Sequence, residues 1–380
     1  MAWPAFDDKN GQAAGGHQTV AARWSRGQDA ALAPPLREPE TLPPFTIDIP
    51  DLPQSLRSLL RRVPRGRVTT YGALATALGD SIAARWVAQH LLDHTHGPRC
   101  RCHRVVRAGG ELGTYITRSA TEKRTLLTAE GVHIADDTVD LAVYGVEPPA
   151  LDRPLARLRA AQNRLLGRHS YRSPRTVPQV VGGLDISYAA PDRGVATYAL
   201  VELPSGRVTW TTTIARRVHF PYISGYLAFR ELPLLLALLD KVCRADRLAP
   251  VLLVDGSGVL HPRRSGLATH LGLLIDHPTI GVTKKLLCGK PAGTPNRAKK
   301  FVAVHEGDEQ LGWVTRPSQS KRKPIYVSPG HRVSVDFAAR VVQEMLLGHK
   351  LPEPIYWADR LSRQRAREMR SADARHQTTT

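Results

Sequence analysis

Apolar residues in the C-terminal half of the chain gather in short runs that predict buried strands and helices. The runs at 180–188, Val-Val-Gly-Gly-Leu-Asp-Ile-Ser-Tyr, and at 250–256, Pro-Val-Leu-Leu-Val-Asp-Gly, are rich in aliphatic and β-branched residues. Residues 232–239 form a short apolar stretch that predicts a buried helix, and residues 155–166 repeat apolar positions at helical spacing. This half of the chain is therefore expected to have its own core, which opens with the helix at 155–166.

Acidic residues interrupt this apolar pattern at positions that predict a metal site. Asp185 lies inside the first run and Asp255 ends the second, although a carboxylate cannot be buried unpaired without a large cost in free energy. Glu231 and Asp359 lie in segments with helical patterns. Any one of these acids could instead cap a helix or a turn. The four together favour a hard cation such as Mg²⁺, or Mn²⁺, which both prefer oxygen ligands.

Longer motifs around these acids resemble those of endonuclease V, a repair nuclease that recognises deaminated bases. The matching segments are Pro-Tyr-Ile-Ser-Gly-Tyr-Leu-Ala-Phe-Arg-Glu at 221–231, Val-Asp-Gly at 254–256, His-Pro-Arg-Arg at 261–264, Thr-Ile-Gly-Val-Thr-Lys at 279–284, Gly-His-Arg-Val-Ser-Val at 330–335 and Pro-Glu-Pro-Ile-Tyr-Trp-Ala-Asp at 352–359. The resemblance implies a ribonuclease H-like, mixed-sheet α/β nuclease domain over residues 151–365.

The resemblance also implies roles for individual residues. Metal ligands would be Asp185, Glu231, Asp255 and Asp359, of which the first three are also catalytic, and Lys284 would contact the reacting phosphate. Tyr222 resembles the aromatic wedge that enters the duplex beside the lesion and offsets the cost of unstacking. Gly225, Leu227 and Gly256 resemble the pocket for the extruded base. A Pro-Tyr…Gly segment is otherwise typical of an ordinary turn.

In the N-terminal half, Arg-Cys-His-Arg-Val-Val at 101–106 resembles the active-site segment of O6-alkylguanine-DNA alkyltransferases. The resemblance implies that Cys102 accepts the alkyl group, with His103 as base and Glu130 as the carboxylate behind it, and without a cofactor. A free cysteine is mostly protonated at neutral pH, so a neighbouring histidine and basic surroundings are needed to favour the thiolate.

The segments at 66–75 and 82–88 resemble the helix-turn-helix of the same family. Arg85 would then fill the space left by a flipped nucleotide, Tyr71 would pack against the rotated phosphate, and Tyr115 would belong to the loop over the alkyl pocket. The resemblance implies a small winged helix-turn-helix domain over residues 47–134, so the chain as a whole is expected to be α/β.

Two departures keep alternatives open in this half. Arg101 stands where the family has proline, and His94-Thr95 stand near an expected Asn-Pro pair. A module that recognises alkylated bases without transferring the alkyl group is therefore an alternative. Cys100, Cys102 and His103 also resemble half of a zinc knuckle, but no second half follows at matching spacing, which argues against zinc.

Composition agrees with a nucleic-acid partner. The 53 Lys and Arg against 34 Asp and Glu give a net charge of +19, which favours binding to phosphates by counterion release. Double-stranded DNA with deaminated or O6-alkylated bases is the expected partner, and inosine-containing RNA is the alternative. Four cysteines suggest a reducing compartment, and no apolar stretch predicts a membrane span, so we expect a monomeric protein in the cytoplasm, with association with the nucleoid as a further option.

Three further segments are expected to lie outside the two domains. Residues 1–46 are rich in Pro and Ala and predict a flexible extension, and residues 135–150, which include a proline pair, predict a linker. Residues 366–380 predict a basic, flexible tail.

Overall fold

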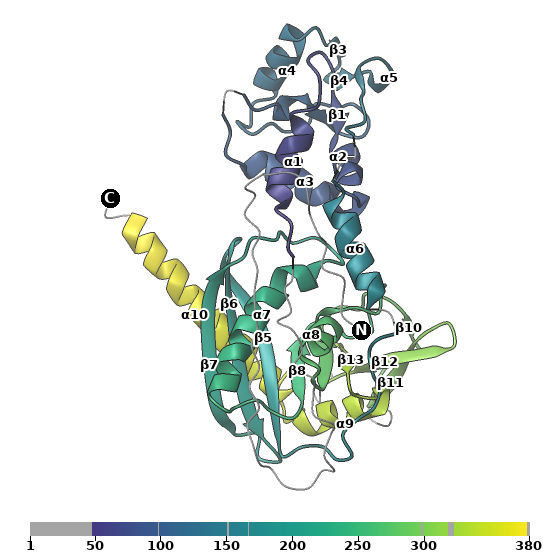
Figure 1. Cartoon of the computed structure of the whole chain (residues 1–380), viewed down its shortest axis with the longest axis vertical. Coiled ribbons are helices and arrows are strands. Elements are labelled where there is room, and N and C mark those ends of the chain that lie inside the picture. Colours follow the sequence, from purple (N-terminus) through teal and green to yellow (C-terminus); the bar gives the residue numbers. More distant parts are fainter. Residues whose placement is uncertain are drawn as a thin grey trace, which may run out of the picture.

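The computed structural model describes residues 48–377, except 98, 150–151, 166, 297, 299 and 318–322. The expected N-terminal extension, residues 1–46, lies outside this range. The described residues form a small, mainly helical module above a larger module built on a central sheet (Figure 1). Helix α6 (Pro154–Arg164) connects the two and confirms the helix predicted at 155–166.

The N-terminal module contains the predicted helix-turn-helix, in α2 and α3. The Thr70 side chain caps α2 by accepting a hydrogen bond from the Ala73 amide over 3.0 Å, which ends the preceding strand and starts the helix. Short parallel strands β1 and β2 hold the start of α2 against the Cys102 segment. The elements are α1 (Leu52–Leu60), β1 (Thr69–Thr70), α2 (Tyr71–Ala77), η1 (Ser81–Ala83), α3 (Ala84–Asp93), η2 (Cys102–Arg104), β2 (Val105–Val106), α4 (Ala120–Ala129), β3 (Ile134–Ala135), β4 (Thr138–Val139) and α5 (Leu141–Tyr144).

The prediction of a linker at 135–150 is wrong for most of that segment. Strands β3 and β4 form a hairpin, and α5 follows directly. Val139 is buried in a small core with Val68, Val106 and Leu127, and the Val146 amide donates to the Val68 carbonyl over 2.8 Å. The segment therefore belongs to the N-terminal module. Its few apolar residues are buried in the core of that module, but in the sequence they are separated by polar and proline residues and show no regular pattern.

The C-terminal module is built on a nine-stranded mixed sheet with the order β10-β11-β12-β13-β9-β8-β5-β6-β7. The pairs β5–β8 and β8–β9 are parallel and the others are antiparallel. The predicted mixed-sheet α/β fold is thus confirmed. The strands are β5 (Val180–Ala190), β6 (Arg193–Glu202), β7 (Val208–Arg217), β8 (Leu252–Asp255), β9 (Thr279–Thr283), β10 (Lys290–Pro291), β11 (Phe301–Glu306), β12 (Glu309–Thr315) and β13 (Ile325–His331).

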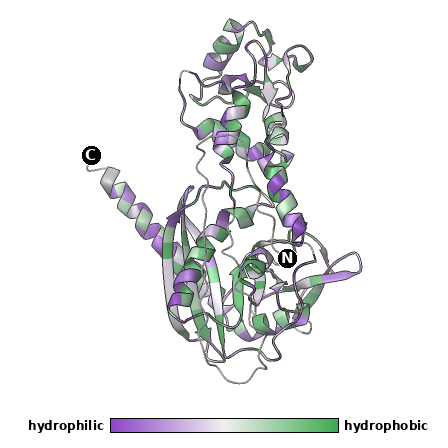
Figure 2. Ribbon diagram, viewed as in Figure 1, coloured by the Kyte–Doolittle hydropathy of each residue, from purple (hydrophilic) through white to green (hydrophobic). Residues whose placement is uncertain are grey.

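Helices cover both faces of this sheet. On one face, α7 (Leu227–Arg244), which contains the predicted buried helix, and α8 (Leu267–Ile275) share a core with alternate residues of β5, β6 and β8. On the other, α9 (Val335–Met345) and the start of α10 (Glu353–Gln377) share a second core with the intervening residues. Figure 2 shows mostly hydrophobic strands inside this module and hydrophilic residues along α6 and the far end of α10.

The prediction of a flexible tail from residue 366 is also wrong as far as residue 377, because α10 continues to Gln377. Ala366 and Met369 are buried against Ala189 and Val195 of the β5–β6 pair. Arg193 pairs with Asp373 over 2.6 Å. An apolar residue once per helical turn is enough to hold this otherwise basic segment on the sheet. Among the helices described, none is long and apolar enough to cross a bilayer.

Candidate active site

Two aspartates lie side by side at the edge of the parallel strands in the C-terminal module. Leu184 of β5 is paired with Val254 of β8 in parallel register, so Asp185 and Asp255, one residue further along each strand, lie at the same level. Lys284 directly follows β9, whose Val282 is paired with Asp255. The register of three neighbouring strands therefore brings together Asp185, Asp255 and Lys284, of which the first and the last are 99 positions apart in the chain.

Helix α10 adds the third acid by crossing β5 very closely. A Cβ atom at Gly183 would lie 2.1 Å from the carbonyl carbon of Pro354, so only glycine permits this crossing. Further along α10, five and eight residues after Pro354, Asp359 and Ser362 lie beside Asp185. The Ser362 hydroxyl is placed to donate to Asp185 Oδ2 over 2.6 Å and lies 3.0 Å from the Asp359 carbonyl. Carboxylate oxygens of Asp185, Asp255 and Asp359 all lie within 4.8 Å of one another.

The cluster carries concentrated negative charge in a buried place. Asp185 is only 6 % exposed, and burial together with the charges of Asp255 and Asp359 raises its pKa to about 8. Lys284 compensates part of the charge, because its Nζ lies 2.7 Å from Asp255 Oδ2 and 3.6 Å from Asp359 Oδ1. Three converging carboxylates with one ammonium group beside them fit a hard divalent cation that takes oxygen ligands.

Glu231, the fourth predicted ligand, lies beside this cluster and outside the three-aspartate group. It is buried in α7, and Tyr188 Oη donates to its Oε1 over 3.1 Å. Arg230 in turn donates to Tyr188 Oη over 3.0 Å. Burial, followed by repulsion from Asp185 and Asp255, raises the pKa of Glu231 to about 8. Glu231 is therefore close enough to feel the aspartates, and it is held in place by a tyrosine.

Ser362 is a site residue that the sequence analysis missed. It is fully buried and lies between Asp185, Asp359 and Ser187, whose hydroxyl is 2.9 Å away. A hydroxyl that bonds to a ligating carboxylate orients that carboxylate. The signal available in the sequence was the three-residue spacing from Asp359, which places both side chains on one face of a helix.

The predicted wedge, Tyr222, lies in the loop before α7. Its side chain is 66 % exposed, which is unusual for a large aromatic residue and leaves the ring free to stack. Gly225, three residues later, has φ +78°, and its carbonyl accepts hydrogen bonds from Arg263 and Gln162. The loop is thus anchored at its end while its aromatic tip stays in solvent.

The other predicted pocket residues lie at the start of α7 and just after β8. Leu227 is the half-buried first residue of α7. Gly256 follows β8, and a Cβ there would come within 3.0 Å of Leu267. Gly256 directly follows Asp255, and Leu227 lies about one helical turn before Glu231, so each is close in the chain to a predicted metal ligand.

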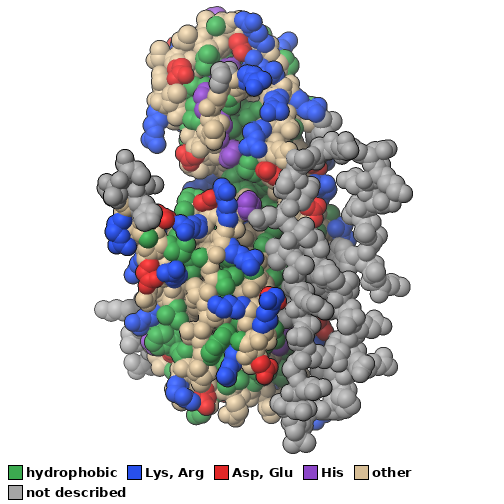
Figure 3. Space-filling view, turned by 60° about the vertical axis from the view of Figure 1, so that its left-hand side comes forward, with side chains coloured by type: hydrophobic (Ala, Val, Ile, Leu, Met, Phe, Trp, Pro, Cys, Tyr) green, Lys and Arg blue, Asp and Glu red, His purple; other side chains and the backbone are tan. Residues whose placement is uncertain are grey.

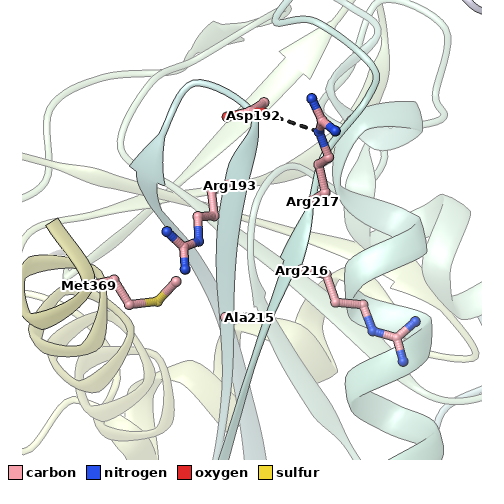
Figure 4. A pocket seen from close by; sticks show the side chains of 6 residues that line it. All are labelled: Asp192, Arg193, Ala215, Arg216, Arg217 and Met369. Carbon is pink, nitrogen blue, oxygen red and sulfur yellow. Dashed lines mark hydrogen bonds and ion pairs between the residues drawn. The ribbon is translucent and has the colours of Figure 1, made fainter. Parts of the chain in front are cut away.

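Basic side chains are spread over both modules on the face drawn in Figure 3. One hollow of about 290 Å³ lies at the sheet edge and is lined by Asp192, Arg193, Ala215, Arg216, Arg217 and Met369 (Figure 4). Arg193 and Arg217 pair with Asp373 and Asp192. Because two of its three guanidinium groups are neutralised, this hollow is a weaker anion site than its arginine content suggests.

In the N-terminal module, His103 and Glu130 form the predicted pair. His103 Nε2 lies 3.0 Å from Glu130 Oε1, and Arg104 donates to both oxygens of the same carboxylate over 2.8 and 2.5 Å. Although burial raises the pKa of Glu130, the hydrogen bonds from Arg104 and His103 outweigh it and leave the pKa below its usual value. These contacts fix the end of α4 to the turn that contains Cys102.

Cys102 itself faces different partners. The side chain is buried, and its Sγ lies 3.5 Å from His96 Nδ1. A hydrogen bond with Cys100 and burial raise the pKa of the Cys102 thiol, and the same hydrogen bond lowers the pKa of Cys100. Burial and the contact with Cys100 therefore oppose ionisation of the Cys102 thiol.

The remaining predicted residues of this module differ in exposure. Arg85 lies on the exposed side of α3 and is free to reach a partner. Tyr71 is half-buried at the start of α2, and burial raises its pKa. Tyr115 is only 3 % exposed and packs edge-on against His96. The structure thus brings Tyr115 next to Cys102 and leaves Arg85 on the surface of the helix-turn-helix.

The sequence model of the endonuclease V family matches residues 164–360, which is more than half of the chain. The chain belongs to the endonuclease V family. A second match, to the DNA-binding domain of 6-O-methylguanine DNA methyltransferase, covers residues 51–132. The chain is therefore a fusion of an alkyltransferase-like DNA-binding domain with an endonuclease V domain, and it is a DNA-repair protein whose C-terminal module is a DNA-cleaving nuclease.

Solved structures agree with the family assignment. Human endonuclease V is 32 % identical over 57 % of this chain and 99 % of its own, with a TM-score of 0.51. Streptomyces avermitilis endonuclease V is 34 % identical over 56 % of this chain and 93 % of its own, with a TM-score of 0.50. Ciona intestinalis endonuclease V, solved with DNA containing an inosine followed by a ribo-adenosine, is 28 % identical over 57 % of this chain and 100 % of its own, with a TM-score of 0.52.

Proposed function

We propose that the C-terminal module nicks DNA on the 3′ side of deaminated bases such as hypoxanthine. The observation that carries this proposal is the convergence of Asp185, Asp255 and Asp359 in the part of the chain that matches endonuclease V. The complex of the Ciona relative with inosine-containing DNA supports the choice of base.

Each residue of the site has a distinct task in this reaction. Asp185, Asp255 and Asp359 would hold Mg²⁺, which supplies an activated water and stabilises charge on the departing oxygen. Ser362 keeps Asp185 oriented. Lys284, next to Asp255 and Asp359, is placed to neutralise a phosphate oxygen. Glu231, whose pKa is raised to about 8, can hold a proton near neutral pH and release it when positive charge approaches.

Tyr222 and the neighbouring glycines would recognise the lesion. An exposed ring in the loop before α7 can replace a base in the stack, which offsets an unstacking cost of a few kcal/mol. Gly225, Leu227 and Gly256 would line the space that receives the extruded base.

The nuclease is tested with end-labelled duplexes that carry one hypoxanthine and with matched undamaged duplexes. We expect Mg²⁺-dependent nicking of the hypoxanthine strand, with the nick one nucleotide beyond the lesion. Asp255→Asn should abolish nicking, while Asp240→Asn, on the surface end of α7, should not. The alternative substrate is inosine-containing RNA, which is supported by the ribo-adenosine that follows the inosine in the Ciona complex. Cleavage of matched RNA strands without cleavage of the DNA strands would overturn the DNA assignment.

For the N-terminal module we propose recognition of O6-alkylguanine, with Arg85 entering the duplex from the exposed face of α3. Recognition without rapid transfer is favoured by the surroundings of Cys102, because its thiol is buried and its pKa is raised by Cys100. A reactive cysteine needs the opposite shift.

The alternative is alkyl transfer to Cys102, which the His103–Glu130 pair supports. Intact-protein mass after incubation with O6-methylguanine duplex DNA separates the two. Tight binding with unchanged mass establishes a lesion reader. A gain of one methyl group that disappears in Cys102→Ala establishes transfer.

A further inference from the structure

Four side chains with nitrogen and sulfur ligand atoms converge in the N-terminal module, far from the aspartate cluster in the sequence. They are His94, His96, Cys100 and Cys102, and one ligand atom from each lies within 4.8 Å of all the others. His94 Nε2 is 3.1 Å from Cys100 Sγ, and His96 Nδ1 is 3.5 Å from Cys102 Sγ. Tetrahedral zinc with bonds of about 2.0 Å to nitrogen and 2.3 Å to sulfur places its ligand atoms about 3.3–3.8 Å apart.

In each histidine, the ring nitrogen that does not face a cysteine already has a hydrogen-bonding partner. His94 Nδ1 lies 3.1 Å from the Leu91 carbonyl, to which it donates, so the lone pair of Nε2 points toward Cys100. His96 Nε2 lies 3.5 Å from Tyr115 Oη, which leaves Nδ1 toward Cys102. Metal-binding histidines characteristically have such a partner on the nitrogen that does not bind the metal.

The segment that carries these ligands is held by a few polar contacts, such as those from Arg101 to the Arg61 and Val63 carbonyls, and by its two cysteines. His94 caps the C-terminal end of α3, Cys102 opens the turn η2, and the residues between them are polar or charged apart from glycine, proline and Cys100. Arg99 and His96 are exposed, so apart from Cys100 and Cys102 this segment contributes little apolar area to the core. A metal cross-link can supply the stability that a short polar loop otherwise lacks.

We propose that His94, His96, Cys100 and Cys102 bind a structural zinc ion. All four positions of the ion would be taken by protein, as in structural rather than catalytic zinc sites. Thiolate and imidazole ligands distinguish this site from the aspartate cluster, which suits magnesium or manganese. Zinc would hold the Cys102 thiolate as a ligand and would join the end of α3 to the turn η2.

The second half of the zinc site was hidden from the sequence pattern. It lies upstream of the cysteines, in His94 and His96, while the adjacent His103 is engaged by Glu130. The spacing His-x-His-x₃-Cys-x-Cys resembles no common zinc-finger pattern, yet the turn between α3 and η2 brings all four ligands together. The inference rests on this geometry and does not depend on the proposed functions of either module.

The test is the zinc content of the full chain, purified without a metal-binding tag and desalted into metal-free buffer. We expect about one zinc per chain, measured by inductively coupled plasma mass spectrometry. Cys100→Ser and His94→Ala should reduce this at least fivefold. Cys243→Ser and Cys288→Ser, which change the two cysteines outside the cluster, and Asp255→Asn, which changes the nuclease site, should leave it unaltered.

A second measurement uses the unaltered sequence, so it does not depend on how the variants fold. Metal-free protein titrated with Co²⁺ should develop the thiolate-to-cobalt absorption of a tetrahedral site, saturating at about one equivalent, and zinc should displace the cobalt. Absence of zinc in protein produced with zinc present, a cobalt spectrum without thiolate absorption, or zinc retained in the double variant Cys100→Ser/His94→Ala would each overturn the proposal.

Discussion

The Tyr226 hydroxyl of the nuclease module donates a hydrogen bond to Asp80 Oδ2 of the N-terminal module over 2.6 Å. The same hydroxyl lies 3.3 Å from the Leu155 carbonyl of α6, and the Leu155 amide donates to the Leu78 carbonyl over 2.9 Å. Tyr226 is completely buried. A Cβ at Gly79 would lie 2.5 Å from the Ala156 amide nitrogen. The two modules therefore meet through a packed joint made by Tyr226, α6 and the turn after α2.

Replacing Tyr226 with Phe should weaken this joint. The change leaves the ring in place and removes a buried hydrogen bond to a carboxylate, for which we expect a loss of about 1–3 kcal/mol in the free energy of unfolding. Chemical denaturation followed by tryptophan fluorescence measures it. Tyr144→Phe is the matched control, because the Tyr144 hydroxyl has no hydrogen bond to another described residue. Equal midpoints for the two variants would show that the Tyr226–Asp80 bond does not stabilise the joint.

Replacing Ser362 with Ala should raise the Mg²⁺ concentration needed for nicking. The hydroxyl orients Asp185 from 2.6 Å, and loss of such a partner typically costs about 10- to 100-fold in metal affinity. The nicking rate of hypoxanthine DNA, measured across a Mg²⁺ titration, should therefore recover at high Mg²⁺. Ser205→Ala, at an exposed turn, should behave like the unaltered protein. A lower rate that no amount of Mg²⁺ restores would instead indicate general damage to the fold.

Replacing Tyr222 with Ala should lower nicking of hypoxanthine DNA by about 10- to 100-fold, because the unstacking cost of a few kcal/mol would no longer be offset. Tyr222→Phe retains the ring and should retain most of the activity. Tyr171→Ala removes another exposed tyrosine, 40 % exposed against 66 % for Tyr222, and should have little effect. Single-turnover cleavage with excess protein is the measurement. Full activity in Tyr222→Ala would show that Tyr222 is not the aromatic wedge.

Replacing Glu130 with Gln should destabilise the N-terminal module in a pH-dependent manner. The carboxylate is paired with Arg104 and His103, and breaking a largely buried pair costs about 3 kcal/mol. The pKa of Glu130 in the folded protein is below its usual value of 4.5. The stability that it contributes is therefore present above about pH 4.5 and is lost as pH falls through the folded pKa.

The thermal midpoint, measured from pH 7 down to pH 3, checks this prediction. The difference between Glu130→Gln and the unaltered protein should be largest near pH 7 and shrink toward pH 3. Glu122→Gln, on the exposed start of α4, serves as the control. A difference that grows on acidification would contradict the assignment of the stabilising charge to Glu130.

The sequence by itself determined the family motifs and the strand-borne acids. Asp185 and Asp255 could be recognised because an acid inside an apolar run has few physical explanations, and parallel pairing of such runs then sets them level. The helix-turn-helix was predicted from the resemblance of residues 66–75 and 82–88 to the alkyltransferase family, and its first helix begins through a local contact, the cap from Thr70 to the Ala73 amide. Local patterns of this kind depend only on residues that are close in the chain, so they can be recognised without knowledge of the tertiary structure.

The tertiary structure alone decided the contacts between distant segments. Ser362 reaches Asp185 because Gly183 lets α10 cross β5, and Tyr226 joins Asp80 across 146 positions. The segments at 135–150 and 366–377 were mistaken for a linker and a tail because isolated apolar residues show no pattern until a core exists to receive them. The His94–Cys102 cluster depends likewise on a turn whose path no spacing rule predicts. In each case the stabilising partner comes from another element, and only folding brings the two together.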